Sequence, residues 1–324
     1  MCTCMDLKTK DYYFGRNLDL EYRFNEKVVI TPRNYEFKLR KEESFKTKYA
    51  MIGMATVVDN YPLYAEAANE KGLSIAGLNF PDNCYYTEEK TERINITPFE
   101  LIPWILGNFS TVEELKEIIE RINIIDISFS ENMYLTPLHW MISDEKDCIV
   151  VEQIKEGLKI YDNPIRVLTN NPPFPYHFTN INNYLNLTPN VPNNRFSSKI
   201  SLETYGKGMG AIGLPGDNSS ASRFIRAAFN KLNSECHEDE ESSVSQFFHI
   251  LDSVAMVKGT NITQDKKYDI TTYSCCINAT KGIYYYKTYN NNQINAVKMD
   301  EKNIKSDKLD IYELVEKQQI NYIN

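Results

Sequence analysis

The sequence predicts an α+β protein built from antiparallel sheets, with its helices gathered in separate groups. Strand-like segments, alternating or rich in β-branched and aromatic residues, occupy both ends and the middle of the chain. Helical patterns occur between these blocks rather than after every strand. No G-x-G-x-x-G loop, P-loop or G-x-S-x-G elbow is present. Nucleotide-binding folds and the serine-hydrolase elbow therefore have no support.

The strand patterns begin at the N-terminus. Residues 2–8 and 12–19 flank the polar triplet TKD and predict a hairpin. Residues 269–278 and 282–288 are rich in Tyr, Ile and Thr, which β-strands favour, and predict two strands near the C-terminus. The other expected strands are residues 27–31, 51–58, 74–78, 138–143, 148–154, 158–161 and 165–169.

The helical patterns are fewer. A capping box from Ser110 to Glu113 predicts a helix whose apolar face continues to Ile122. The acidic patch ECHEDEESS, residues 235–243, predicts a solvated loop or the start of a helix. The other expected helices are residues 98–106, 220–232 and 245–257.

Length and charge limit the possible partners. The 324 residues suffice for one large domain, and without repeats or linkers we expect a single domain over residues 1–324. The net charge is −8 and basic residues do not cluster, so nucleic acid and anionic membrane surfaces are not expected partners. No stretch approaches the roughly 20 apolar residues that span a bilayer.

Seven cysteines occur, at positions 2, 4, 84, 148, 236, 275 and 276. Their odd number, the absence of repeated C-x-x-C pairs and an N-terminus without signal-peptide character favour a reducing cytoplasm. Cys275 and Cys276 are expected to point to opposite faces of one strand, the alternative being a strained disulfide. The four histidines lack ligand spacing, so no metal or other cofactor is expected.

The dipeptide Met1-Cys2 suggests a catalytic group. Because Cys2 is small, the initiator methionine can be removed, which would leave Cys2 with a thiol and a free α-amine. An α-amine titrates at about 7.7–8.0 and a free cysteine near 8.5. One residue could then supply both nucleophile and base. The alternatives are a Met-Cys start that arose by chance and a Cys/His dyad, whose local signatures are missing.

The second strand of the hairpin carries charges of both signs in the segment FGRNLD, residues 14–19. Pairing with residues 2–8 would bring Arg16 and Asp19 near the N-terminus. A guanidinium beside Cys2 favours the thiolate, and a carboxylate could hold the α-amine. The alternative is a surface ion pair, the commoner fate of such a couple.

Short blocks along the chain match one known family in the family's own order. The blocks are MCT (1–3), FGRNLD (14–19), NEKGL (69–73), GLNFP (77–81), LHWMISD (138–144), LTNNP (168–172), GLPGD (213–217) and ASRF (221–224). Through them the sequence resembles the choloylglycine hydrolases, or bile salt hydrolases, and their penicillin V acylase relatives. The resemblance implies a four-layer αββα N-terminal-nucleophile hydrolase fold, with two antiparallel sheets between helical layers.

The resemblance also implies a catalytic set. All its positions are met here: Cys2, Arg16, Asp19, Asn79, Asn170 and Arg223. The Asn79 backbone N–H and the Asn170 amide would form the oxyanion hole. From the residues alone, both asparagines read as turn residues, and Arg223 is an unusual cation near the start of a helix. Because the whole set is intact, a non-catalytic carrier of apolar ligands is disfavoured.

The implied reaction is hydrolysis of glycine- or taurine-conjugated bile salts by a bacterial homotetramer without a cofactor; the alternative is a penicillin V or other N-acyl amide acylase. Asn79 favours the bile-salt branch, because the acylases often carry tyrosine there. Loop 206–210, with Lys207, is expected near the amino-acid half and favours glycine conjugates. The expected pocket residues, each of which could equally be core, are Leu18, Val58, Ala65, Phe129, Met133 and Leu138.

Overall fold

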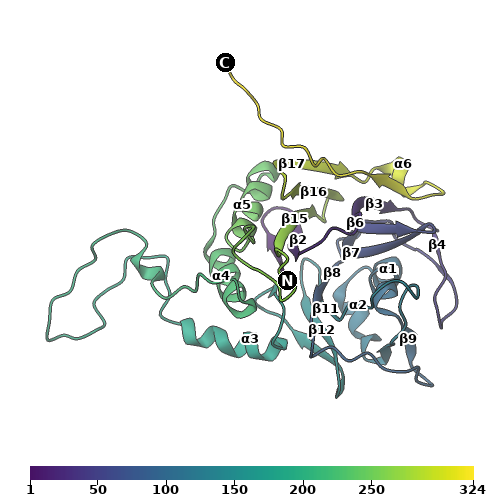
Figure 1. The fold of residues 1–324 in the computed structure, drawn as a ribbon, viewed down its shortest axis with the longest axis horizontal. Coiled ribbons are helices and arrows are strands. Elements are labelled where there is room, and N and C mark those ends of the chain that lie inside the picture. The colour runs from purple at the N-terminus through teal and green to yellow at the C-terminus, as the bar shows by residue number, and fades with distance from the viewer.

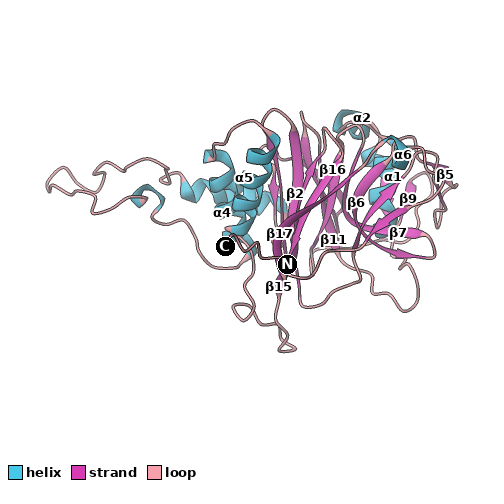
Figure 2. Ribbon diagram, turned by 90° about the horizontal axis from the view of Figure 1, so that it is seen from above, coloured by secondary structure: helices cyan, strands magenta, loops and turns pink.

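The computed structural model describes residues 1–324 and shows two sheets packed face to face between two layers of helices (Figure 2). One helical layer consists of α4 (Ser220–Asn233) and α5 (Glu240–Asp252). On the far side of the sheets lie α1 (Pro98–Asn108) and α2 (Val112–Lys116). This is the four-layer αββα arrangement, so the predicted fold class is confirmed.

The first sheet has six strands in the order β14-β1-β2-β15-β16-β17. The predicted N-terminal hairpin is confirmed, with Cys2 opposite Leu18 and Cys4 opposite Arg16. On the other side of β1, the short β14 pairs only with Cys4 and Met5, so Cys2 has no strand neighbour there. The strands are β1 (Cys2–Lys8), β2 (Tyr12–Leu20), β14 (Val167–Leu168), β15 (Ile270–Asn278), β16 (Ile283–Thr288) and β17 (Asn291–Lys298).

The second sheet has eight strands in the order β13-β12-β11-β8-β7-β6-β3-β18. Its strands are β3 (Lys27–Thr31), β6 (Met51–Val58), β7 (Tyr61–Asn69), β8 (Ser74–Asn79), β11 (Leu138–Ser143), β12 (Cys148–Ile154), β13 (Gly157–Asp162) and β18 (Asp310–Tyr312). The minor elements are β4 (Glu36–Phe37), β5 (Phe45–Lys46), β9 (Ile94–Ile96), β10 (Ile122–Ile124), α3 (Phe174–Asn180), α6 (Glu301–Ile304) and the 3₁₀ turns η1 (Ile119–Arg121), η2 (Ile181–Tyr184) and η3 (Met209–Ala211).

Two hydrophobic cores hold the layers together. The larger core contains apolar residues of both sheets and of α4 and α5, and it includes Cys2 and Leu18. The smaller core joins the second sheet to α1 and α2 and includes Trp140 and Leu101. Since successive side chains of a strand point to opposite faces, the two faces of β1 and β2 look into different surroundings: the opposing sheet on one side and the α4/α5 layer on the other.

The helix predicted from Ser110 to Ile122 is wrong in its extent. Thr111 is the N-cap residue and α2 ends at Lys116. Ile122 instead begins β10, which pairs in parallel with Ile94 of β9. Tertiary pairing therefore overrode the apolar helical periodicity at the end of this segment.

A helix boundary and a strand also differ from the prediction. Helix α5 begins at Glu240, before the predicted residue 245, because the Asp239 side chain caps it and accepts a hydrogen bond from the Ser242 N–H at 2.9 Å. The acidic patch is thus the start of a helix. Strand β7 was not predicted, because its Pro, Ala and Glu residues are depleted in strands; it forms because β6 and β8 flank it.

All seven cysteines are free thiols. Cys275 and Cys276 both lie in β15, so their side chains alternate between the faces as predicted. Cys275 faces the second sheet, where its Sγ lies 3.6 Å from Oε1 of Glu66. None of the helices combines the length and the apolar composition that crossing a membrane requires.

The segment between α3 and α4 projects from the body of the molecule (Figure 1). We call residues 185–216 the arm. The arm includes η3 and the loop around Lys207, and both views place it away from the N-terminus. Four of its large apolar side chains are highly exposed: Leu185, Val191, Phe196 and Tyr205 have exposed fractions of 83%, 72%, 82% and 89%. Leu187 and Leu214, near its two ends, pack against the larger core.

Candidate active site

The strand register sets the direction of the Cys2 main chain. Met1 and Asp19 exchange two backbone hydrogen bonds, from the Met1 nitrogen to the Asp19 carbonyl (2.5 Å) and from the Asp19 N–H to the Met1 carbonyl (2.8 Å). In an antiparallel pair the next residues are not bonded to each other. The nitrogen and carbonyl of Cys2 therefore point away from β2, into the gap that β14 leaves open.

Asn170 fills this gap. Its side-chain Oδ1 accepts a hydrogen bond from the Cys2 nitrogen at 2.8 Å, across 168 residues of sequence. Its Nδ2 donates to the Asn79 carbonyl at 2.7 Å. In this structure Met1 is attached, so the Cys2 nitrogen is a peptide N–H. After removal of Met1, the same atom would be the α-amine, already aligned by Asn170.

Arg223 binds both members of this contact from helix α4. Its Nη2 donates to Oδ1 of Asn170 at 2.7 Å, and its Nη1 donates to the Cys2 carbonyl and, at 2.7 Å, to Oγ1 of Thr3. The side chain is fully buried, and burial lowers the pKa of Arg223, whereas the nearby Asp19 and Cys2 raise it. A cation near the start of α4 is unfavourable for the helix dipole, and its position is explained by these contacts.

Arg16 and Asp19 lie on opposite faces of β2, so they form no surface ion pair. Arg16 is fully buried between the sheets, on the same face as the Cys2 side chain. Burial lowers the pKa of Arg16, but the negative charges of Cys2 and Glu66 nearby raise it by a larger amount, so the net shift is upward. Nη1 donates to the Gly77 carbonyl at 2.5 Å, whereas Nε and Nη2 have no hydrogen-bond partner in the protein.

Asp19 lies on the amine side of the site. Its Oδ1 accepts a hydrogen bond from Oγ1 of Thr271 at 2.6 Å, and its Oδ2 is buried without a partner. Burial raises the pKa of Asp19, while Arg223 and the chain terminus oppose the rise. Asp269 lies nearby, with Oδ2 3.7 Å from the Met1 ammonium and Oδ1 buried without a partner. Two carboxylates thus surround the chain terminus.

The main chain of Asn79 faces the same region. The Phe80 N–H donates to the Pro137 carbonyl at 2.8 Å, so the preceding pair, Asn79 and Leu138, is not hydrogen-bonded. Both the N–H and the carbonyl of Asn79 therefore point away from β11. The carbonyl binds Asn170, and the N–H on the same side has no ladder partner, because β7 pairs with β8 only further back.

Two buried histidines support the Asn170 loop. Nε2 of His177 lies 2.9 Å from the Asn170 carbonyl, and Nε2 of His139 lies 2.9 Å from the Thr169 carbonyl. Because a carbonyl oxygen only accepts, both nitrogens donate. Burial lowers the pKa of His177 to about 4, so its ring is neutral at pH 7. Neither ring is bonded to Cys2, so the Cys/His dyad has no support here.

The expected pocket residues divide into two groups. Leu18, Ala65 and Leu138 adjoin the catalytic candidates. Leu18 pairs with Cys2, Leu138 pairs with Asn79, and the carbonyl of Ala65 contacts Arg16. Val58, Phe129 and Met133 lie further out. Val58 pairs with Tyr61, whose ring packs on Phe129 with centroids 5.5 Å apart, and Met133 is exposed in the loop before β11.

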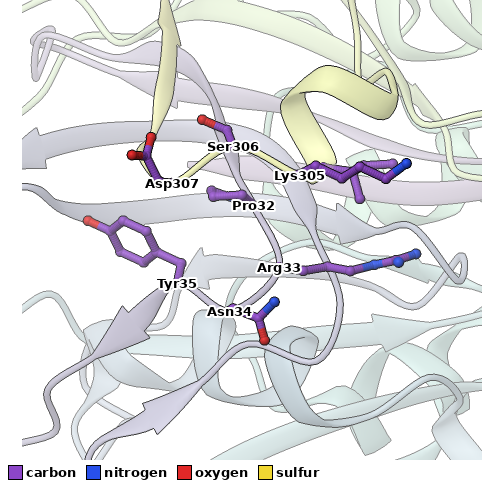
Figure 3. A pocket seen from close by; sticks show the side chains of 8 residues that line it. Pro32, Arg33, Asn34, Tyr35, Lys305, Ser306 and Asp307 are labelled. Atoms are coloured by element: carbon purple, nitrogen blue, oxygen red, sulfur yellow. The ribbon is translucent and has the colours of Figure 1, made fainter.

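A polar cavity of about 420 Å³ lies elsewhere, between the loop after β3 and the loop after α6 (Figure 3). Arg33, Tyr35 and Lys305 are among its lining residues, and no predicted site residue contributes to it. Loop 206–210, with Lys207, belongs to the arm, which Figure 1 shows projecting away from the N-terminus.

The comparisons with known proteins agree with this geometry. A profile of the linear amide C–N hydrolases of the choloylglycine hydrolase family matches residues 2–315. A protein of Lactiplantibacillus plantarum named bile salt hydrolase/transferase is 51% identical over the full length of both chains. A Clostridium perfringens protein of the same name is 46% identical, again over both full chains.

Solved structures give the same assignment. A variant of the conjugated bile acid hydrolase from C. perfringens superposes with a TM-score of 0.92 at 45% identity, over 100% of both chains. The penicillin V acylase of Agrobacterium tumefaciens gives a TM-score of 0.74 at 18% identity, over 96% of this chain and 91% of that one, and shares the fold. The protein is therefore an amidohydrolase that acts on linear amides. It belongs to the choloylglycine hydrolase family.

Several residues of the site were missed from the sequence. Thr3, Thr271 and Asp269 contact or adjoin catalytic candidates, yet as single polar residues they carry no pattern of their own. His177 was noted only for its lack of ligand spacing. Glu66 lies in the strand that was not predicted. The alternation of β15 could have placed Thr271 near Asp19 only if the pairing of β15 with β2 had been known.

Proposed function

We propose that this protein hydrolyses glycine- or taurine-conjugated bile salts, with Cys2 as nucleophile after removal of Met1. The observation that carries the proposal is the convergence on Cys2: Arg16 lies on the side of its thiol, and Asn170 binds its nitrogen. The names of relatives that match the full chain, bile salt hydrolase/transferase and conjugated bile acid hydrolase, support the choice of substrate.

The first half of the reaction forms a thioester. The α-amine takes the thiol proton, which leaves a thiolate beside Arg16. The thiolate attacks the amide carbonyl carbon, and the carbonyl electrons move onto oxygen. The Asn79 N–H and the second hydrogen on Nδ2 of Asn170 then stabilise this oxyanion. When the C–N bond breaks, the ammonium of Cys2 gives its proton to the leaving amine.

The second half releases the bile acid. The neutral α-amine accepts a proton from water as the oxygen attacks the thioester carbonyl. The C–S bond then breaks, and the thiolate and ammonium of Cys2 are restored. Asp19, which lies beside the chain terminus, would stabilise the ammonium, whereas Arg223 holds Asn170 and the Cys2 carbonyl in place. Leu18, Ala65 and Leu138 would form the inner wall of the acyl pocket, and Val58, Phe129 and Met133 its outer part.

Comparison of substrates tests this function. We expect kcat/KM for glycocholate and taurocholate to exceed that for penicillin V by at least about tenfold, measured as released glycine, taurine or 6-aminopenicillanic acid. Because loop 206–210 lies in the arm, one chain by itself offers no reason for a preference between glycine and taurine. Faster cleavage of penicillin V would favour the acylase alternative instead.

We further propose that the arm mediates self-association into a homotetramer. Monomeric proteins rarely expose several large apolar side chains on one projecting segment. Light scattering should give four times the 37.6 kDa of the chain. Replacing Val191, Phe196 and Tyr205 with serine should yield smaller species with the same secondary structure. A monomeric parent protein, or an unchanged assembly in the triple variant, would count against the arm as the interface.

We also propose that residues 1–324 work as one domain in a bacterial cytoplasm. One family profile spans residues 2–315, and both sheets contribute to the site, Arg16 from one and Asn79 from the other. All seven cysteines are free, and a Cys2 nucleophile must stay reduced to react, which suits a reducing compartment.

A further inference from the structure

A buried carboxylate lies directly behind Arg16. Glu66 of β7 is fully buried between the two sheets. Its carboxylate accepts hydrogen bonds from the hydroxyl of Tyr273 (2.8 Å to Oε2) and from that of Tyr284 (2.6 Å to Oε1). The Cys275 thiol lies 3.6 Å from Oε1, and Nη1 of Arg16 lies 3.7 Å from Oε2. Each of these four polar contacts offers the carboxylate a donor.

This cluster crosses the interface between the sheets in both directions. Arg16 of the first sheet reaches the Gly77 carbonyl of the second sheet, and Glu66 of the second sheet reaches two tyrosines of the first. The anchoring bond to Gly77 at 2.5 Å does not involve Glu66. Since Arg16 is fully buried in this packing, it is held in place even without the Glu66 charge.

The donors favour the ionised form of Glu66. Burial raises the pKa of Glu66, and the net shift is upward, although Arg16 and the hydrogen bonds from Tyr284, Tyr273 and Cys275 oppose the rise. A carboxylate with several donors and no acceptor nearby is suited to carry a negative charge. The titratable groups that face Glu66 are Arg16 from β2, Tyr273 and Cys275 from β15, and Tyr284 from β16, with Cys4 of β1 further along the same interface.

Arg16 thus lies between two negative charges. Its Nη1 side faces Glu66, and its Nε and Nη2 are buried donors without a protein partner. Buried donors of this kind require a partner, here the Cys2 thiolate or the substrate. The titratable groups that interact with Cys2 are the cations Arg16 and Arg223 and the neutral hydroxyl of Tyr22. Glu66 partly neutralises the first of them.

We propose that Glu66 is a positioning residue, held in place by Tyr273 and Tyr284. Its negative charge limits the positive charge that Arg16 presents to Cys2, and this keeps the thiolate strongly nucleophilic. The inference rests on the proposed function only in taking Cys2 as the nucleophile. Without the Glu66 charge, the thiolate would form more readily but attack more slowly, because nucleophilicity falls as a thiol becomes more acidic.

The test is the pH dependence of Cys2 alkylation by iodoacetamide, followed by mass spectrometry on the N-terminal peptide, with fragmentation of the peptide to distinguish Cys2 from Cys4. In Glu66→Gln the midpoint of the alkylation profile should fall by about one pH unit. This is the size expected when the counter-charge of a buried cation beside a thiol is removed. With glycocholate, kcat should fall about threefold, which follows from a Brønsted slope of about 0.4–0.5, and KM should stay unchanged.

A second variant covers the case in which Glu66→Gln does not fold. The double variant Tyr273→Phe, Tyr284→Phe removes the hydroxyl donors, so Glu66 takes up a proton and the midpoint should fall in the same direction. Tyr64→Phe is the matched control, because Tyr64 is a buried tyrosine of the same strand whose hydroxyl bonds Thr31 in the other core. Its midpoint should equal that of the parent protein.

An unchanged or higher midpoint in Glu66→Gln would overturn the proposal, as would an equal shift in Tyr64→Phe. Alkylation reports the thiolate whether or not bile salts are turned over. Failure of the proposed function would therefore show as a parent protein that does not cleave glycocholate, and it is distinguishable from failure of the Glu66 inference.

Discussion

Replacing Cys2 with alanine is expected to abolish glycocholate hydrolysis while leaving the fold intact. The variant retains the α-amine and the oxyanion donors but has no atom that can form the thioester. We expect kcat to fall by at least about 10⁴-fold, as for the loss of other catalytic nucleophiles. Because only one buried sulfur is lost, the free energy of unfolding should change by about 1 kcal/mol. Release of glycine and thermal unfolding measure the two effects.

The matched control for this substitution is Cys276→Ala. Cys276 is also fully buried in the first sheet, but it lies in β15 on the face opposite to Cys275 and contacts no catalytic candidate. It removes the same atom from the same core, so it should match Cys2→Ala in stability and keep activity within about twofold. Substantial turnover by Cys2→Ala would exclude Cys2 as the nucleophile.

Retention of Met1 is expected to inactivate the enzyme almost as completely. With Met1 attached, the Cys2 nitrogen is an amide, which cannot accept a proton at neutral pH, and Met1 occupies the strand edge beside Asp19 through two backbone hydrogen bonds. The thiol then has neither its base nor its proton donor. General acid–base catalysis contributes about 10²–10⁴-fold, so a loss of about 10³-fold is expected.

A cleavable leader placed directly before Cys2 provides this experiment with its own control. The uncleaved protein should be inactive, and cleavage that exposes Cys2 should restore activity in the same sample, with the new N-terminus verified by mass spectrometry. The fold should not change, because the hairpin is already formed with Met1 in place. Full activity before cleavage would show that the α-amine is not the base.

The N-terminal hairpin shows how far local patterns reach. Its two strands are joined by a short turn, so the alternation of residues predicted both elements, and the register puts Arg16 on the same face as Cys2. The same spacing could not reveal that the two charged residues have different roles, with Arg16 on the side of the thiol and Asp19 on the side of the amine. That division follows from the faces of β2, which only the packing of the layers distinguishes.

Two elements were predicted less well, because their local sequence favours a structure other than the one they adopt. The apolar run that ends at Ile122 has helical spacing, yet its last residues pair with β9. Strand β7 has the composition of a poor strand and forms because its neighbours on both sides supply hydrogen-bond partners. In each case, strand pairing outweighed a local preference of a few tenths of a kcal/mol per residue.

The sequence by itself determined the fold class, the hairpin and, through its family blocks, the six catalytic candidates. The tertiary structure decided what each candidate touches: the bond from the Cys2 nitrogen to Asn170, the hold of Arg223 on both, and the charge of Glu66 behind Arg16. These contacts join residues between about 50 and 220 positions apart in the chain. Side-chain alternation and capping act over a few residues only, so contacts at this range depend on how the sheets and helices pack.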